Sequence, residues 1–588
     1  MRLTNVAHLR LPFGRLLCYQ TVAAGKRGDL PISFDQRRHV LAGDRDGSWM
    51  ALSFQLSAAA NRAELAAAWH AVVERHGTLR TVFEIDEAQA LRLREVTALP
   101  GAWEEHTIAP GQSVNDALRA VLDARCRPLS QPSHALCVLE TADGPTVVIA
   151  VDHSHVDMWS MLAILRDFLA ALAAARDGIG PQLPPAPSFT EHTRALARRP
   201  RAPQDVRGRW QEILAASDNA MPRFPLPLGD PTPQLERVEV RDVLDVDDAA
   251  AFSAQARVEA VSTLSLAVSA MTAITRELAG TPLRAVFPVH SRYDATWHDS
   301  AGWFITNSVI ESGDPAPAAC AAAVKEAIRL GSWPLADIME PWGGMPEAPG
   351  MFAISWLDLR RLPVQVDAAG LQAQYVGASI RTDGVMLWFI LDQSGLHLRC
   401  RYPDTKLARE HVGGWLDALV ERLRATARTS VRSHLKVGDE SFTIARAGRA
   451  DVADIVALLV DDELGRHREM DETAAYLAAY DVVVLDRSQH LAIVRDSRGR
   501  AAGTMQLSLI PGLTRGGATR LQIEGLRVAA TRRSRGLGSA MLEWAHEYGR
   551  TRGAQLAQVT TDEVRARARA FYARHGYDTK HVGLKRTL

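Results

Sequence analysis

The distribution of apolar and polar positions changes most sharply between residues 146 and 160. Val147–Val151 is an apolar run, Asp152–Asp157 is rich in aspartate and histidine, and apolar residues then recur at helical spacing through Arg176. A short apolar run predicts a buried strand, and apolar positions three and four residues apart predict a helix. We therefore expect a strand, a turn that carries polar side chains, and a helix, in that order.

Similar patterns predict further elements up to about residue 427. Helices are expected over Asn61–Arg75, Ala249–Leu278 and Arg409–Ala425. Strands are expected over Trp49–Leu56, Met351–Trp356, Gly384–Leu391 and Gly395–Tyr402. The proline-rich stretch at 180–187 predicts the end of a first lobe. The mixture predicts an α/β fold with one lobe at 1–187 and a second at 188–427.

A polar, weakly patterned segment at 428–441 predicts a linker to another unit at 442–588. In that unit a strand-like run ends at Val528, and the turn Arg533–Ala540 opens a helix that extends through Tyr548. Glycines in this turn would let backbone amides approach an anion, and a helix N-terminus adds unpaired N–H groups. The turn therefore predicts a pyrophosphate site. A glycine turn that opens an ordinary helix is the alternative for so short a motif.

Overall charge and cysteine usage narrow the protein class. The 588 residues contain 68 Lys and Arg against 68 Asp and Glu, so no net field recruits nucleic acid or an anionic membrane. Five scattered cysteines without metal-ligand spacing predict reduced thiols. We see neither a leader nor an apolar run of membrane-spanning length in the sequence. We expect a cytoplasmic protein that binds neither nucleic acid nor membrane.

The polar turn offers a general base. Histidine titrates near neutral pH, and His153 has a carboxylate four residues later, Asp157, that could hold its ring. Two alternatives remain open for this turn. The pattern His153-x-His155-x-Asp157 is similar to the opening of the metallo-β-lactamase metal motif, which needs a further histidine where Met158 stands. The cluster could also be a polar strand end whose imidazoles bond to nearby backbone.

Six landmarks occur in an order that is more specific than any one of them. They are SFDQRR, RHGTLRTVF, DHSHVDM, PVHSR, GWFITNS and RYPDTK. This order resembles the condensation domain of nonribosomal peptide synthetases over about residues 25–427. The resemblance implies two lobes like those of chloramphenicol acetyltransferase, with a tunnel for two substrates between them and no metal.

The resemblance also implies roles for three residues. The family's HHxxxDG signature places its second histidine at His153 and its aspartate at Asp157, and Arg292 becomes the ion-pair partner of that aspartate. His153 would activate an acceptor amine that attacks an acyl or aminoacyl thioester, while the ion pair would shape the turn. The sequence departs from the signature at Asp152 and Met158. The family's DFGWG segment also lacks a counterpart.

The donor thioester would come from outside the chain. The sequence contains no carrier attachment motif and no adenylation module, so the donor is expected either on a carrier protein in trans or on coenzyme A. The arginine-rich run Arg194–Arg209 could dock a carrier with an acidic surface. A solvated connecting segment is the alternative for this run.

The C-terminal landmarks resemble the GNAT family of N-acetyltransferases over about residues 442–588. They are the strand at 521–528, the glycine turn, the strand at 556–560 and the segment 569–577. The resemblance implies that the pyrophosphate of acetyl-CoA, or of another acyl-CoA, is held by a run of residues in and beside the turn. These are Arg533, Arg535, Gly536, Leu537, Gly538, Ser539 and Ala540.

The same resemblance implies further cofactor and catalytic contacts. The backbone of Leu526, Arg527 and Val528 would pair with the pantetheine arm. Tyr572 would protonate the departing thiolate, and Glu524 would serve as base for the incoming amine. The alternatives are that Tyr572 is an amphipathic core residue and that Glu524 is a structural carboxylate.

These patterns predict a bifunctional acyltransferase of small-molecule or peptide biosynthesis. One activity would form an amide from a thioester, and the other would acetylate an amine with acetyl-CoA; the expected acceptors are small amines or amino acids. In one alternative only the C-terminal unit is catalytic and the N-terminal part is a binding or docking module. In another the N-terminal part forms an ester.

Overall fold

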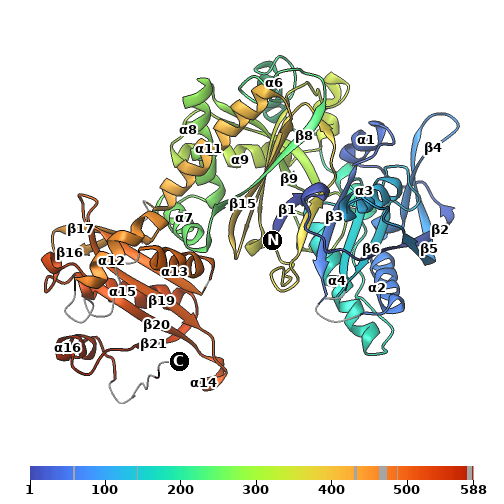
Figure 1. The fold of residues 1–588 in the computed structure, drawn as a ribbon. Helices are drawn as coiled ribbons and strands as arrows, with labels where there is room; N and C mark the ends of the chain where they lie inside the picture. Colours follow the sequence, from blue (N-terminus) through green and yellow to red (C-terminus); the bar gives the residue numbers. More distant parts are fainter. Residues whose placement is uncertain are drawn as a thin grey trace. The chain divides into compact units, whose positions relative to one another are not determined.

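The computed structural model of the chain contains helices and sheets throughout, which confirms the predicted mixed α/β class (Figure 1). It describes residues 1–56, 60–141, 144–428, 434–461, 473–486, 488–578 and 586. The chain divides into one unit at Met1–Ala425 and another at Thr426–Leu588. Each unit contains its own β-sheets.

An eight-stranded sheet forms the first lobe of the N-terminal unit. Its strands, in spatial order, are β1 (Arg2–Asn5), β12 (Gln374–Gly377), β3 (Trp49–Gln55), β7 (Thr146–Asp152), β6 (His134–Glu140), β2 (Arg15–Arg27), β5 (Leu91–His106) and β4 (Thr81–Ile85). Every residue of β7 is buried, because helices cover both faces of the sheet. β12 joins this sheet from the second half of the unit, so the second lobe contributes one strand to the sheet of the first.

Helices α2 (Arg62–Arg75) and α4 (Met158–Arg176) lie side by side on one face of this sheet (Figure 1). Helix α3 (Val114–Arg125) packs on the other face. Within the described part of the chain, α4 is long and apolar enough to cross a membrane, contrary to the expectation from the sequence. Its apolar residues pack in the core cluster that contains Trp69 and Phe168, which accounts for that composition.

A seven-stranded sheet forms the second lobe. Its strands, in spatial order, are β10 (Ile305–Ser312), β9 (Leu283–His290), β11 (Phe352–Asp358), β14 (Val385–Asp392), β15 (Gly395–Pro403), β8 (Gln234–Leu244) and β13 (Arg381–Thr382). The accompanying helices are α7 (Val246–Val258), α8 (Thr263–Ala279), α9 (Pro317–Gly331), α10 (Leu335–Met339) and α11 (Lys406–Arg428).

The single helix predicted at Ala249–Leu278 is wrong, because α7 and α8 are separate and meet at 93°. Ala260 adopts a φ of 54° between them, and the Ser262 side chain caps α8 by accepting from the amide of Ser265 at 3.0 Å. A serine N-cap favours a new helix start. The apolar spacing on either side masks this break in the sequence.

The arginine-rich run lies in α5 (Phe189–Ala197), α6 (Gln204–Ala215) and the segment between them. Arg207 donates to Asp337 at 2.7 Å and Arg209 donates to Glu311 at 3.0 Å. Arg199 donates to the carbonyl of Ser332 at 2.6 Å. Much of the positive charge in this run is therefore neutralised or engaged within the unit itself.

The C-terminal unit contains a six-stranded sheet. Its strands, in spatial order, are β16 (His434–Val437), β17 (Glu440–Arg446), β18 (Gln489–Arg495), β19 (Ala501–Ile510), β20 (Thr519–Val528) and β21 (Ala554–Val559). Its helices are α12 (Val452–Val460), α13 (Thr473–Leu485), α14 (Thr514–Gly517), α15 (Leu537–Thr551) and α16 (Ala566–Arg574).

Strand β16 lies inside the segment expected to be a linker. Its residues alternate so that Leu435 is buried while His434 and Lys436 are exposed, and the turn at Gly438, with a φ of 59°, returns the chain to β17. A short edge strand with one polar face is hard to distinguish from a linker by composition. All five cysteines of the chain are free and buried, as expected for reduced thiols.

Candidate active sites

The turn after β7 is fixed at the start of α4. Asp157 is the N-cap residue of α4, and its carboxylate accepts from the amide of Ser160 at 2.7 Å. Asp152 ends the strand, so residues 153–157 form the turn predicted from the sequence. Aspartate is a favoured N-cap because it satisfies an amide that the helix leaves unpaired.

Asp157 and Arg292 form a buried ion pair that joins the two lobes. The guanidinium donates to one carboxylate oxygen at 2.7 Å and to the other at 3.3 Å. The same guanidinium donates to the Ser160 hydroxyl at 2.8 Å and to the Ser300 carbonyl at 3.1 Å. Phe304 donates its amide to Asp157 at 3.1 Å. These bonds commit the Asp157 carboxylate to the turn, so it does not hold the ring of the neighbouring histidine.

The His153 ring is held by stacking instead. It lies against Trp303, with ring centroids 4.3 Å apart and planes inclined by 30°, and its Nδ1 has no hydrogen-bond partner on another described residue. Burial lowers the pKa of His153 below 6.5, His39 lowers it further, and interaction with its own backbone offsets part of this. The imidazole is therefore neutral at neutral pH, which is the form that can accept a proton.

Asp152, which replaces the first histidine of the signature, is a structural anion. It accepts from the Ser48 hydroxyl at 2.5 Å and from the Ser154 amide at 2.9 Å, and it lies 3.5 Å from His39 Nε2. Burial alone would raise the pKa of Asp152, but these partners outweigh it and lower the pKa to about 2. The substituted position therefore stays ionised and anchors the strand end.

His39, on α1 (Phe34–Leu41), fills the space beside Asp152. Its Nδ1 lies 3.1 Å from a terminal nitrogen of Arg45, and a guanidinium has only donors, so Nδ1 is the acceptor. Nε2 then carries the proton and faces Asp152. The ring of His39 also lies 5.1 Å from that of Trp303 and 6.1 Å from that of His153, so it helps to confine the His153 ring from the side of α1.

His155 contacts a different part of the fold from His153. Its Nδ1 lies 3.4 Å from the hydroxyls of both Thr78 and Thr81, and its ring packs on Phe83. Burial lowers the pKa of His155 to about 4. Across the described residues there is no group of three histidine, cysteine, aspartate or glutamate side chains that could hold a metal.

Asp35 on α1 provides a stability test of this region. Burial raises the pKa of Asp35 from 3.8 to about 6, and Arg38 and Thr306 offset only part of that shift. Because the folded state binds the extra proton, stability should fall by about 3 kcal/mol as pH rises from about 4 through 6. We expect Asp35→Asn to remove this fall and to be the more stable protein above that range. Urea unfolding across pH measures it, and parallel profiles for the two proteins would contradict it.

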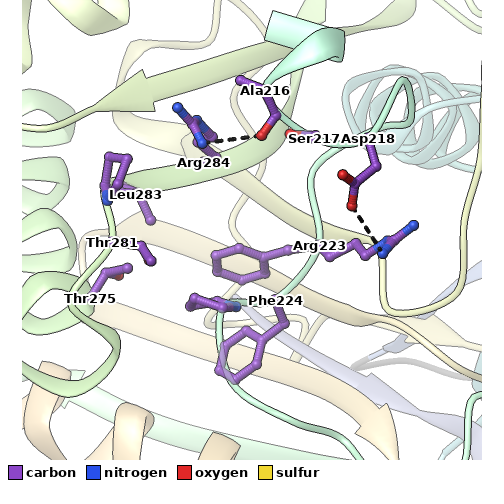
Figure 2. Close-up of a pocket in the computed structure, with 12 residues that line it drawn as sticks. Ala216, Ser217, Asp218, Arg223, Phe224, Thr275, Thr281, Leu283 and Arg284 are labelled. Atoms are coloured by element: carbon purple, nitrogen blue, oxygen red, sulfur yellow. Dashed lines mark hydrogen bonds and ion pairs between the residues drawn. The ribbon is translucent and has the colours of Figure 1, made fainter.

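A cavity of about 220 Å³ opens elsewhere in the second lobe. Figure 2 shows Arg284 bonded to the carbonyl of Ala216 and Arg223 paired with Asp218 at its wall. The cavity adjoins Leu283 at the start of β9, whereas Arg292 follows the end of that strand. Eight residues of strand span about 25 Å, so this cavity is separate from the histidine turn.

The C-terminal unit has a gap in its sheet beside the predicted pantetheine contacts. β20 and β21 pair in parallel as far as Ile523 and Val559, while β20 continues to Val528. Among the described residues, the stretch containing Leu526, Arg527 and Val528 therefore has an edge that β21 does not use. Gly525 has a φ of 58° within an irregularity of the β19–β20 pairing.

The glycine turn opens α15 without a side-chain cap. Gly536 is the N-cap residue with a φ of 93°, a conformation that only glycine adopts without strain. The amide of Ala540 already donates to the carbonyl of Gly536 at 3.1 Å, so the first-turn amides of residues 537–539 are the ones that helix geometry leaves unpaired. Ser539 also lies 3.0 Å from His575 Nε2 through its hydroxyl.

The remaining residues predicted for the cofactor site differ in their exposure and in their contacts. Arg533 donates to the Val528 carbonyl at 2.9 Å and to the Asp461 carboxylate at 3.0 Å, so it braces the turn. Arg535 is exposed at the turn, and Gly538 lies against Val528 and Phe571. Glu524 is exposed on β20.

Tyr572 is half-buried on α16, and its ring lies 5.2 Å from Phe571 and 5.5 Å from Tyr577. Burial raises the pKa of Tyr572, and Arg527 and Arg565 offset part of the rise. The phenol therefore stays protonated at neutral pH, as a proton donor must. Tyr572 packs against the same core cluster as Leu526 and Val528 of the predicted pantetheine contacts.

Comparison with known proteins identifies both units. The model of the condensation-domain family matches residues 26–326, more than half of the chain. The chain belongs to the condensation-domain family. This condensation-domain protein also contains an acetyltransferase domain of the GNAT family, whose model matches residues 453–577. Both resemblances expected from the sequence are confirmed.

The condensation-domain protein has relatives among acyltransferases. The acyltransferase PapA3 of Mycobacterium tuberculosis is 25% identical over 390 residues, which cover 62% of this chain and 81% of that protein. The trehalose-2-sulfate acyltransferase PapA2 of the same organism is 26% identical over 439 residues, which cover 69% of this chain and 93% of that protein. Family and relatives place the chain among acyltransferases.

Solved structures show the same fold. The PapA2 acyl transferase superposes with a TM-score of 0.64 at 21% identity, covering 73% of this chain and all of that one. The first condensation domain of the CDA synthetase superposes with a TM-score of 0.54 at 15% identity, covering 69% of this chain and 97% of that one. These matches confirm the two-lobed architecture that the sequence predicted.

Sequence reasoning did not assign a role to two residues that lie beside His153, Trp303 and His39. Trp303 lies within a landmark segment and His39 directly follows one, but their contacts with His153 could not be predicted. Aromatic residues beside a histidine give no periodic signal. Their proximity depends on how α1 and the segment before β10 are folded against the turn.

Proposed function

We propose that the N-terminal unit transfers an acyl group from a thioester to an acceptor amine, with His153 as the general base. The observation that supports this most is the state of His153, which is neutral, half-buried and stacked on Trp303 at 4.3 Å. The turn that holds it is locked by the Asp157–Arg292 pair at 2.7 Å. A fixed neutral imidazole is suited to general base catalysis.

In this proposal the acceptor attacks the carbonyl carbon of the thioester while the imidazole takes the acceptor's proton. The resulting tetrahedral intermediate collapses, the carbon–sulfur bond breaks, and the proton passes from His153 to the leaving thiolate. Asp157 takes no part in proton transfer, because its oxygens accept from Arg292, Ser160 and Phe304. Its role is to hold the turn.

A hydroxyl acceptor is the second candidate for this unit, giving an ester in place of an amide. The similarity to PapA2, which is named as an acyltransferase of trehalose 2-sulfate, favours it. Mass spectrometry of products from matched amine and alcohol acceptors separates the two. If neither forms from coenzyme A or carrier-bound donors, while the C-terminal unit remains active, the N-terminal unit is a binding module.

We propose that the C-terminal unit acetylates an amine with acetyl-CoA. The part of β20 beyond Ile523, which does not pair with β21, and the start of α15, which has no side-chain cap, support a pantetheine arm followed by a pyrophosphate. Glu524, exposed on β20, would take the proton from the amine, and Tyr572 would donate a proton to the departing thiolate. The two activities would complete one product, and formation of unrelated products by the two units would contradict that connection.

Tyr572→Phe tests the second activity. We expect thiol release from acetyl-CoA to fall by about 10²-fold, at the low end for general acid catalysis because a thiolate needs little help to leave. Tyr577→Phe is the matched control, since its hydroxyl bonds to His546 at 2.8 Å. Equal losses in both variants would assign the effect to packing. An unchanged rate for Tyr572→Phe would remove this residue from the mechanism.

A further inference from the structure

Two arginines, one buried (Arg399) and one half-buried (Arg401), lie next to each other on β15. Arg399 and Arg401 are two residues apart, so their side chains share one face of the strand. Trp388 on β14 lies directly opposite Arg399 in the sheet register. Both guanidinium groups lie over its ring, at 4.8 Å and 5.2 Å from the centroid. We call Arg399 and Arg401 the arginine pair.

Part of the hydrogen-bonding capacity of this pair is unused. Arg399 is only 4% exposed, and in the described part of the chain its Nε and one terminal nitrogen have no hydrogen-bond partner. The Nε of Arg401 is also buried and makes no hydrogen bond, although a carboxylate oxygen of Glu236 lies 3.9 Å from it. A buried donor left unpaired costs free energy comparable to a lost hydrogen bond. Such donors on two adjacent cations point to a ligand.

The charge around the pair is unbalanced. Glu236 lies 3.9 Å from Arg401, and one of its oxygens accepts from Asn5 at 2.9 Å. Burial lowers the pKa of Arg399 to about 10, the neighbouring Arg401 contributes to the same shift, and Glu236 opposes it. Arg399 therefore remains protonated at neutral pH. Two cations face one carboxylate, which leaves room for one further negative charge.

The sheet register brings this pair close to the histidine turn. A Cβ on Gly377 would lie 3.4 Å from the guanidinium of Arg399. Gly377 is in register with Met50 on β3, and Met50 is in register with Val151 on β7, two residues before His153. Two strand spacings amount to about 10 Å. The pair and the proposed base thus lie at the same end of the sheet.

We propose that the arginine pair binds an oxyanion of a substrate of the N-terminal unit: a carboxylate, sulfate or phosphate group. Guanidinium groups match such oxygens with paired N–H donors, and burial strengthens the bonds. Half-buried Met50, Met158 and Trp388 pack at the rim of the adjoining core, and they would contact the apolar part of the same molecule. The link to catalysis rests on the proposed acyl transfer, whereas the anion site itself does not.

A binding experiment tests the site without turnover. Inorganic sulfate is the probe, and the full chain is heated in sodium sulfate or in sodium chloride of equal ionic strength. We expect sulfate to raise the unfolding temperature of the wild type by several degrees more than that of Arg399→Met or Arg401→Met, because a ligand stabilises the state it binds. General salting effects act on all proteins alike. Arg241→Met is the matched control, since Arg241 is paired with Glu239 at 2.6 Å.

Without sulfate, Arg399→Met should be at least as stable as the wild type, because it removes a buried and unbalanced cation. The same sulfate response in the wild type and both variants would overturn the proposal. His153→Ala should keep the wild-type sulfate response even where it abolishes turnover. This separates failure of the anion site from failure of the proposed acyl transfer.

A kinetic experiment then identifies which substrate carries the oxyanion. Two pairs of substrates are compared. The acceptor pair is an amino acid, which is anionic, and its neutral carboxamide; the donor pair is acyl-CoA and the acyl thioester of N-acetylcysteamine, which lacks phosphate. We expect Arg399→Met to raise KM by about 10-fold or more, with kcat little changed, for only one of the two charged substrates, the anionic acceptor or the acyl-CoA. A 10-fold change in KM corresponds to about 1.4 kcal/mol. A KM that is unchanged for every pair would exclude a substrate as the ligand.

Discussion

His153→Ala is expected to lower the acyl-transfer rate of the N-terminal unit by about 10²–10⁴-fold, the range that a general base contributes. The loss should occur in kcat, because the imidazole acts on the attacking atom and adds little to substrate binding. The Asp157–Arg292 pair does not involve His153, so the variant should fold like the wild type. Product formation from a thioester and an acceptor, followed by mass spectrometry, measures the effect.

The C-terminal activity of the same protein serves as the internal control. Thiol release from acetyl-CoA by the GNAT unit should be unchanged in His153→Ala, which excludes a general loss of folded protein. The pH profile adds a second check. Since burial and His39 lower the pKa of His153, the rate should decline on the acid side only below pH 6.5, the ordinary value for histidine. Full activity of His153→Ala would show that another group accepts the proton.

The strand, turn and helix around His153 could be predicted because their signal is local. An apolar run, a polar cluster and a 3.6-residue period specify β7, the turn and α4, whose bounds agree with the expected helix from Met158 to Arg176. The Asp157–Arg292 pair spans 135 residues and has no local signal. It was predicted only because the order of landmarks resembled a known family.

Contacts that depend on packing or register could not be predicted in this way. The stacking of Trp303 on His153 requires the second lobe to be placed against the first. The approach of Arg399 to Gly377 depends on a four-residue strand, β12, entering the sheet of the other lobe. A four-residue strand has too few positions for a period to be visible. The site residues that the sequence analysis did not assign are those whose contacts depend on long-range packing and strand register of this kind.

The sequence substitution at Asp152 shows how family patterns and physical contacts complement each other. The departure from the HHxxxDG signature raised the question whether the N-terminal unit is catalytic. In the structure the aspartate is bonded to Ser48 and Ser154 and faces the protonated nitrogen of His39. Position 152 therefore supports the strand end, and its replacement leaves the neutral imidazole of His153 in place.

Asp157→Ala is expected to lower the free energy of unfolding of the N-terminal unit by about 3–5 kcal/mol, the cost of leaving a buried charge without its partner. Arg292 would keep its positive charge inside the protein, and α4 would lose its N-cap. Burial alone would raise the pKa of Asp157, but Arg292 outweighs it and lowers the pKa below 3.8. The carboxylate is thus fully ionised at pH 7, and its contribution is lost only as pH falls through that lowered value.

Urea unfolding of the single variants and of the double variant Asp157→Ala/Arg292→Met measures this coupling at pH 7. We expect the double variant to be more stable than the sum of the single losses predicts, because it leaves no unpaired charge. Asp157→Asn retains an oxygen that can cap α4 and should lose less stability than Asp157→Ala. If Asp157→Ala were as stable as the wild type but inactive, the carboxylate would act in the reaction itself. Loss of both stability and turnover in Asp157→Ala, with both partly retained in Asp157→Asn, would instead assign Asp157 to holding the turn that carries His153.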